Sequence, residues 1–157
     1  KDTYAKTKGL GEIINDKHLT LRTSVIGPEL KSNGEELFHW FMNQKGEING
    51  FTKAIWSGVT TLVLAKAVNW AIESNVTGLY HITNNKSIDK YSLLQLIKHS
   101  IGKDIIINPF DGKEIYKNFI DTRGELSFEI PSYKEMISEM VEMILINRKL
   151  YKQYLIK

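Results

Sequence analysis

The sequence predicts an α/β fold with a largely parallel sheet. Short runs of β-branched and aliphatic residues alternate with helical segments along the chain. No internal repeat and no Pro/Gly/Ser linker interrupts this alternation. A length of 157 residues, with 42% hydrophobic and 25% charged residues, is enough for one unit with its own core.

The first third of the chain contains segments with the periodicity of a helix and segments with that of a strand. Gly9 and Gly11 weaken its first helical segment, and Gly27-Pro28 ends its first β-rich segment in a loop. The elements expected there are a helix over residues 3–15, a strand over 19–26, a short aromatic helix over 37–43 and a short strand over 47–52.

The rest of the chain has clearer boundaries. Asp89 is a helix N-cap, Gly102 closes the same helix, and Ser132 with Glu135 forms a capping box. The elements expected are a helix over 60–74, a strand over 78–83, a helix from 90 to 101, a strand over 105–107 and a last helix with the apolar stripe Met136, Ile137, Met140, Val141 and Ile144.

Composition excludes several classes of function. The chain has no cysteine, so disulfides and thiolate metal sites are excluded, and a reducing cytoplasm is the expected location. The net charge of +3 comes mostly from scattered lysines, which does not favour nucleic-acid binding. No apolar run approaches the roughly 18 residues of a membrane span. The four histidines lack metal-ligand spacing, so no metal is expected.

Tyr4 and Lys8 form a Y-x-x-x-K pattern, and Tyr4 is the one tyrosine with a lysine four residues on. On a helix the two side chains lie one turn apart. A nearby ammonium favours the phenolate and lowers the tyrosine pKa from about 10, so that the phenol can exchange a proton with a carbonyl oxygen. The alternative is a solvated pair on a helix surface.

The succession of this helix and the strand LRTSVIGP resembles the extended short-chain dehydrogenase/reductases. Within them, Trp56 to Thr61 resembles the Q-x-G-x-P-T segment of the dTDP-4-dehydrorhamnose reductase group, where Gly58 and Thr61 match. Gly78 to Ile82 looks like the G-x-Y-H strand of that group. Trp56 and Thr60 depart from the pattern, as does the sequence before Asp121-Thr122-Arg123.

The resemblance implies the C-terminal half of a Rossmann-type doubly wound parallel sheet plus a small substrate-binding lobe. Residues 1–35 and 60–85 would belong to the NAD(P)-binding fold, and residues 36–59 and 86–157 to the lobe. The chain opens on Lys1 and has no glycine-rich phosphate-binding fingerprint, so the N-terminal half, with its catalytic Ser or Thr, is expected upstream. The fragment alone is expected to be inactive.

The same resemblance assigns roles to individual residues. Tyr4 and Lys8 would be catalytic and would also contact the cofactor, NADP or NAD, together with Ser24 and Val25. The nucleotide sugar would be bound by Gly27, Glu29, Phe51, Trp56 and Arg123. Core packing is the equal alternative for Phe51 and Trp56, and a surface salt bridge is the alternative for Arg123.

The function implied for the intact parent is reduction of a 4-keto nucleotide sugar, as in dTDP-rhamnose and polysaccharide biosynthesis. One alternative is a regulatory subunit that binds a partner enzyme and keeps only vestigial chemistry. Another is an epimerase or dehydratase of the same superfamily. The expected partners are the nucleotide sugar and either a second copy of the chain or the upstream half.

Overall fold

The computed structural model describes residues 3–112, 114–122, 124 and 127–156, and the side chains of residues 4 and 5 lie outside what it describes. The helices are α1 (Thr3–Leu10), α2 (Leu37–Asn43), α3 (Thr61–Glu73), α4 (Lys90–Ile101) and α5 (Tyr133–Ile146). The strands are β1 (Leu19–Arg22), β2 (Val25–Ile26), β3 (Glu47–Phe51), β4 (Ala54–Trp56), β5 (Val59–Thr60), β6 (Gly78–His81), β7 (Ile88–Asp89), β8 (Ile106–Phe110) and β9 (Ile115–Lys117).

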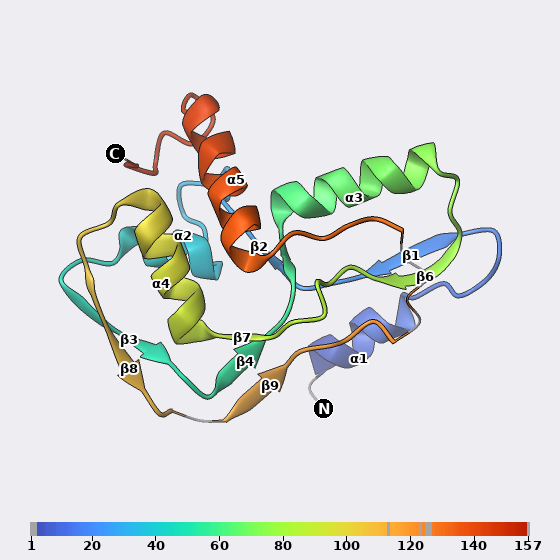
Figure 1. Cartoon of the computed structure of the whole chain (residues 1–157), viewed down its shortest axis with the longest axis horizontal. Helices are drawn as coiled ribbons and strands as arrows, with labels where there is room; N and C mark the ends of the chain where they lie inside the picture. The colour runs from blue at the N-terminus through green and yellow to red at the C-terminus, as the bar shows by residue number, and fades with distance from the viewer. Residues whose placement is uncertain (1–2, 113, 123, 125–126, 157) are drawn as a thin grey trace.

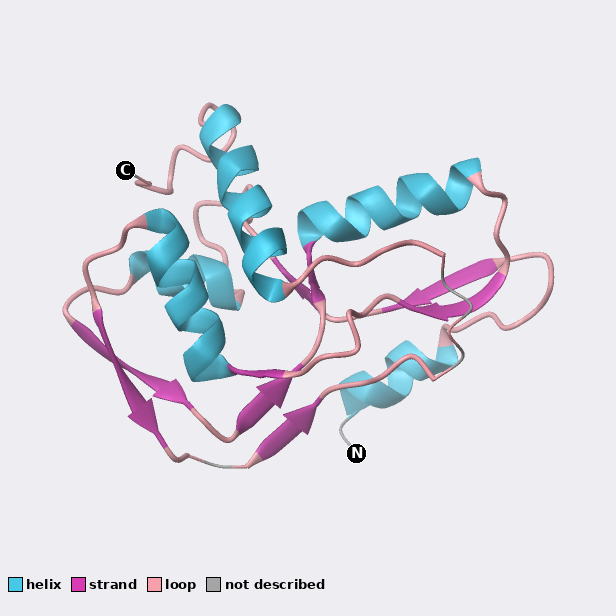
Figure 2. Cartoon of the chain, viewed as in Figure 1, coloured by secondary structure: helices cyan, strands magenta, loops and turns pink. Residues whose placement is uncertain are grey.

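The α/β class with mainly parallel pairing is confirmed. The pairs β1–β6, β2–β5, β3–β8 and β4–β9 are parallel, and β4–β7 is antiparallel. The strands form four small sheets rather than one. Strands β1 and β6 lie between α3 on one side and α1 on the other, while β3, β8 and α4 gather at the opposite end of the molecule (Figures 1 and 2).

The single strand expected over 19–26 is interrupted at Thr23 and Ser24. The reason is a change of partner, because β1 pairs with β6 whereas β2 pairs with β5. The Thr23 hydroxyl donates to the carbonyl oxygen of Ile82 (2.9 Å), and Val59 N–H donates to the carbonyl oxygen of Ser24 (2.9 Å). The chain is therefore held on both sides of the break.

Two glycines allow the segments around this break to approach closely. A Cβ on Gly58 would lie 2.2 Å from the carbonyl oxygen of Ser24, and a Cβ on Gly27 would lie 2.2 Å from Oγ1 of Thr61. Both positions therefore exclude any larger residue without movement of the backbone or of α3. Gly58 and Thr61 are the two residues that match the Q-x-G-x-P-T pattern. The close packing at both positions is a structural reason for a glycine and a threonine there.

The first helix is shorter than the expected 3–15. It ends at Leu10, where Gly11 N–H bonds to the Lys8 carbonyl oxygen (3.2 Å) and the last turn tightens. The Asn15 side chain then accepts bonds from two backbone N–H groups and forms a turn. The short strands β4, β5, β7 and β9 were not expected, because two or three residues carry no readable periodicity.

The later helices follow the sequence closely. Asp89 caps α4 through the Ser92 N–H (2.8 Å), that helix ends at Gly102, and Ser132 with Glu135 forms the capping box of α5. The predicted stripe of α5 is confirmed as core. Its fully enclosed members are Met136, Ile137, Met140, Val141 and Ile144.

The segment after α5 folds back on the loop that follows β2. The Tyr154 hydroxyl accepts a hydrogen bond from Glu29 N–H (2.9 Å) and lies 2.9 Å from Nδ1 of buried His39. The Gln153 amide donates to the Glu29 carbonyl oxygen. Since Tyr154 is itself only 7% exposed, this contact fixes the Glu29 backbone against the core.

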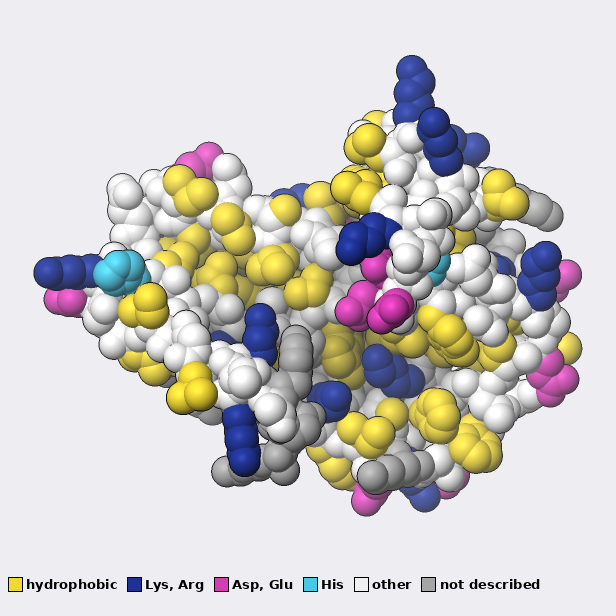
Figure 3. Space-filling view, turned by 180° about the vertical axis from the view of Figure 1, so that it is seen from behind, with side chains coloured by type: hydrophobic (Ala, Val, Ile, Leu, Met, Phe, Trp, Pro, Cys, Tyr) yellow, Lys and Arg dark blue, Asp and Glu magenta, His cyan; other side chains and the backbone are white. Residues whose placement is uncertain are grey.

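The surface mixes charge types. Basic, acidic and apolar side chains are interspersed over the face shown in Figure 3, and its basic groups are spread rather than gathered. Within residues 3–156, as far as they are described, every helix falls short of the length and apolarity needed to cross a bilayer.

Replacement of Gly58 by alanine tests the close approach at the strand break. Its new methyl group would overlap the Ser24 carbonyl, so we expect the free energy of unfolding to fall by about 1–3 kcal/mol. Urea denaturation measures the change. Gly9→Ala is the matched control, because a Cβ there meets nothing within 4 Å and alanine favours the helix. Equal stability of the two variants would refute the packing argument.

Replacement of Tyr154 by phenylalanine tests the contact with Glu29. The ring stays but the Glu29 N–H and His39 lose their shared partner, so we expect a loss of about 1–3 kcal/mol in unfolding free energy. Tyr151→Phe is the control, because the Tyr151 ring stacks on Tyr154 without a hydroxyl bond to any described residue. Chemical denaturation of both variants should separate them, and identical midpoints would contradict the assignment.

Candidate active site

One cavity of about 740 Å³ collects residues from several separate parts of the chain. Its walls come from the end of α1, the loop after β1 and β2, the start of α2, the end of β4 and the start of α4. Six of the residues expected at the site line it. They are Lys8, Ser24, Val25, Gly27, Glu29 and Trp56.

Lys8 reaches this cavity from the last turn of α1. It also lines a second hollow of about 720 Å³ between α1 and β1, beside Thr23 and His81. Tyr4 stands one turn earlier on the same helix, and its side chain lies outside the described part of the structure. The structure thus places the lysine of the Y-x-x-x-K pattern at the cavity and leaves the tyrosine hydroxyl a prediction.

The loop from Ser24 to Glu29 forms the cavity wall because strand alternation and packing fix its direction. Ile26 is buried in the core while Val25, its neighbour on the other face, is 39% exposed toward the cavity. Gly27 is held against α3, and Glu29 is held by the segment around Tyr154. The Glu29 carboxylate turns back to accept the Glu36 N–H (2.8 Å).

Trp56 occupies a core position and also lines the cavity, and its contact with a substrate stays a prediction. It is 7% exposed and its ring lies 5.9 Å from the ring of Tyr133, which is a core position. It also lines the cavity.

Tyr133, the aromatic neighbour of Trp56, is a buried phenol. Burial raises the pKa of this phenol, and its hydroxyl donates to the Lys86 carbonyl oxygen.

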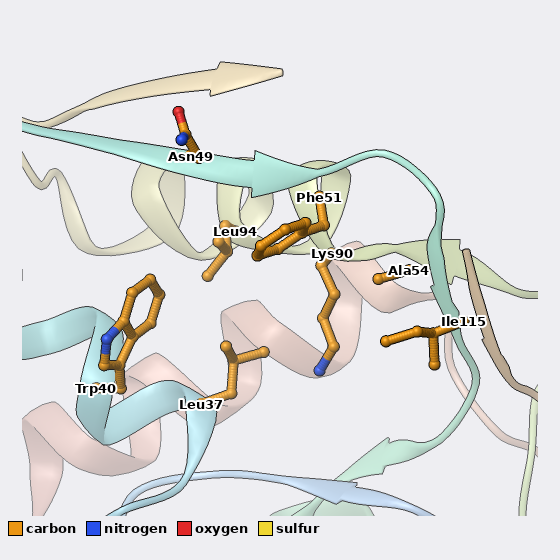
Figure 4. Close-up of a pocket in the computed structure, with 8 residues that line it drawn as sticks. All are labelled: Leu37, Trp40, Asn49, Phe51, Ala54, Lys90, Leu94 and Ile115. Atoms are coloured by element: carbon orange, nitrogen blue, oxygen red, sulfur yellow. The ribbon is translucent and has the colours of Figure 1, made fainter. Parts of the chain in front are cut away.

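Phe51 does not share this cavity. It lines a neighbouring one of about 460 Å³, whose wall is apolar apart from one amide and one ammonium group (Figure 4). The Phe51 ring packs edge-to-face on Phe110 (5.6 Å) and is 43% exposed, so one side of it remains open. The full lining is Leu37, Trp40, Asn49, Phe51, Ala54, Lys90, Leu94 and Ile115.

Leu37 and Lys90 line both cavities, so the two are adjacent. Neither residue was singled out from the sequence, and neither was Lys117, which lines the larger cavity. Lys90 did carry a signal. It is the first residue of a helix whose N-cap is Asp89, a position where basic residues are unfavourable.

Two further expectations concern Arg123 and metal binding. Arg123 lies outside the described residues, so its proposed contact with the substrate remains a prediction. In the described part of the chain, His, Asp and Glu side chains form no group of three that could hold a metal ion.

Comparison with known proteins adds evidence on the fold. No protein-family model and no curated protein sequence matches the chain. Among solved structures, the dTDP-4-dehydrorhamnose reductase from Bacillus anthracis in complex with NADP is similar, with a TM-score of 0.65 and 20% identity. The match covers 89% of this chain and 52% of that one.

Two other solved structures agree with this result. The dTDP-4-dehydrorhamnose reductase ortholog from Clostridium acetobutylicum has a TM-score of 0.61 at 19% identity, covering 83% of this chain and 50% of its own. The UDP-N-acetylglucosamine 4-epimerase from Methanobrevibacter ruminantium, in complex with UDP-N-acetylmuramic acid, has a TM-score of 0.59 at 19% identity, covering 92% and 50%.

The chain spans about half the length of each of these proteins. At this level of identity the likeness shows the fold, and the fold is the one implied by the Y-x-x-x-K helix and the LRTSVIGP strand. The chain thus has a fold similar to that of about half of each of these solved structures.

Proposed function

We propose that this chain is the substrate-side half of an enzyme that uses NADPH or NADH to reduce a 4-keto nucleotide sugar. The observation that carries the proposal is the cavity of about 740 Å³, which joins Lys8 to the Ser24–Glu29 loop and to Trp56. These residues come from separate segments, and the resemblance assigned Lys8 and residues of the loop to the reaction centre and Trp56 to the nucleotide sugar. The similar reductases support the reaction type at the level of fold.

In this proposal Tyr4 donates a proton to the oxygen of the substrate ketone. Lys8 stabilises the phenolate that remains, because its ammonium group lies one helical turn further on, at the cavity. The bound nicotinamide supplies the hydride. The described residues fit one end of such a cofactor, since the Lys8 ammonium and the apolar Val25 side chain both line the cavity.

The cofactor's diphosphate would be held elsewhere, in an upstream half with a glycine-rich loop. Residues 1–35 and 60–85 would complete the cofactor-binding sheet there, and residues 36–59 and 86–157 would form the substrate lobe. This division explains why the cavity opens beside α1, a helix whose described side chains are exposed.

The substrate would occupy both cavities. The sugar would lie in the larger one, against Gly27, Glu29 and Trp56. The nucleoside would lie in the smaller one, where the open side of the Phe51 ring offers a flat apolar surface to a base. Arg123 would contact the diphosphate.

A second candidate is epimerisation at the same carbon. It is favoured by the likeness to the UDP-N-acetylglucosamine 4-epimerase, whose TM-score is close to those of the reductases. Both reactions use a tyrosine proton donor and a nicotinamide, but only a reductase consumes NADPH in proportion to product.

The deciding assay uses the full-length gene product that contains this chain, supplied with dTDP- and UDP-linked 4-keto-6-deoxysugars. NADPH and NADH oxidation is followed by absorbance. We expect Tyr4→Phe to lower kcat by about 100-fold or more, because only the proton donor is lost. Lys8→Met should also lower kcat, whereas Lys6→Met, on the same helix and outside the cavity, should not.

The other outcomes point elsewhere. Interconversion of UDP- or dTDP-hexoses that carry a 4-hydroxyl group, supplied in a parallel assay with NAD and without net consumption of cofactor, would favour the epimerase. Binding of dinucleotide without turnover of any sugar in the panel would favour a regulatory subunit that binds a partner enzyme. Equal rates for Tyr4→Phe and the unchanged protein would remove Tyr4 from the mechanism.

A further inference from the structure

Lys90 stands at the boundary between the two cavities. Together with Leu37 it is one of the two residues that line both. Figure 4 shows its side chain extending from α4 into the space bordered by Phe51, Leu37 and Ile115. Its nitrogen lies 5.9 Å from the centre of the Trp56 ring, an orientation that a cation–π attraction favours.

The position is unfavourable for a cation in three ways. Lys90 is the first residue of α4, where the helix dipole is positive. Burial lowers the pKa of its ammonium group, and repulsion by Lys117 lowers it further. Glu36 raises this pKa, but in the described part of the structure no carboxylate lies within ion-pair distance of Lys90.

The surrounding charges add to this imbalance. Lys8 and Lys117 line the larger cavity with Lys90, so three lysines contribute to its wall. The carboxylates on its wall are Glu29 and Glu36, and one Glu29 oxygen is already used by the Glu36 N–H. A bound anion would relieve the repulsion between Lys90 and Lys117 and would also benefit from the helix dipole.

We propose that Lys90, assisted by Lys117, binds the diphosphate of the substrate where it passes from the sugar cavity to the nucleoside cavity. This inference rests on the proposed function, because the diphosphate of a nucleotide sugar joins its sugar to its nucleoside and would therefore lie where the two cavities meet. It assigns a substrate-binding role to a residue that no sequence pattern marked. The ammonium is kept at an intrinsically poor position because the ligand compensates for it.

The test measures binding of dTDP, UDP, thymidine and pyrophosphate by calorimetry to the full-length gene product that contains this chain, so it does not depend on catalysis. Lys90→Met keeps the length of the side chain and removes its charge. We expect it to weaken dTDP or UDP binding by about 10- to 100-fold and to leave thymidine binding unchanged. Lys90→Arg should retain most of the affinity. Lys98→Met, on the same helix and outside both cavities, is the matched control.

A second readout separates binding from a structural role. Because the unliganded ammonium is unfavourable, Lys90→Met should raise the melting temperature of the full-length protein without ligand by about 2 °C while it weakens nucleotide binding. A residue that only supports the fold would change both in the same direction.

The inference is overturned if the unchanged protein binds neither dTDP nor UDP, or if Lys90→Met binds them as tightly as Lys98→Met does. Pyrophosphate binding that equals dTDP binding would also overturn it, because the nucleoside cavity would then play no part. These results are independent of the reductase assay. Loss of diphosphate binding in Lys90→Met supports the inference even where no 4-keto sugar is reduced.

Discussion

The close approach of two backbone segments, Ser24 to Gly27 and Gly58 to Thr61, is the constraint on which the rest of this structure depends. The Ser24 carbonyl oxygen accepts the Val59 N–H at 2.9 Å, and Gly58 leaves room for that oxygen. Gly27 in turn leaves room for Thr61 at the start of α3. This contact ends one strand pair, begins another and turns the chain between them into a cavity wall. Hydrogen-bonded strands and a packed helix therefore position a loop that would otherwise have many conformations.

Apart from α1, which ends five residues before its expected end, the helices were predictable because their signals are local. Asp89, Ser132 and Glu135 bond within their own first turns, and the buried stripe of α5 repeats at helical spacing. The β structure was less predictable, because a strand depends on a partner that can lie anywhere in the chain. The break at Thr23 and Ser24 reflects such a choice, since nothing in the local sequence shows that β1 and β2 have different partners.

The candidate site shows the same division. Lys8, the Ser24–Glu29 loop and Trp56 could be named from motifs, and the structure brings them to one cavity. Phe51 was assigned to the same substrate and lies in the adjoining cavity. Lys90 belongs to no motif, and its importance follows only from which side chains and charges surround it. Sequence motifs identify residues that occupy matching positions in a family. The charges that surround a side chain such as Lys90 can be recognised only from the three-dimensional structure.

The contact between Glu29 and Tyr154 has a consequence for the order of folding. The two residues are 125 positions apart, so this bond closes one of the longest loops in the chain. During synthesis α3, α4 and most of the core can form before residue 154 has left the ribosome. The cavity wall at Glu29 can be fixed only after residue 154 has left the ribosome, because Tyr154 holds the Glu29 backbone. Ligand-binding competence should therefore arise after most of the secondary structure, in a late and comparatively slow step.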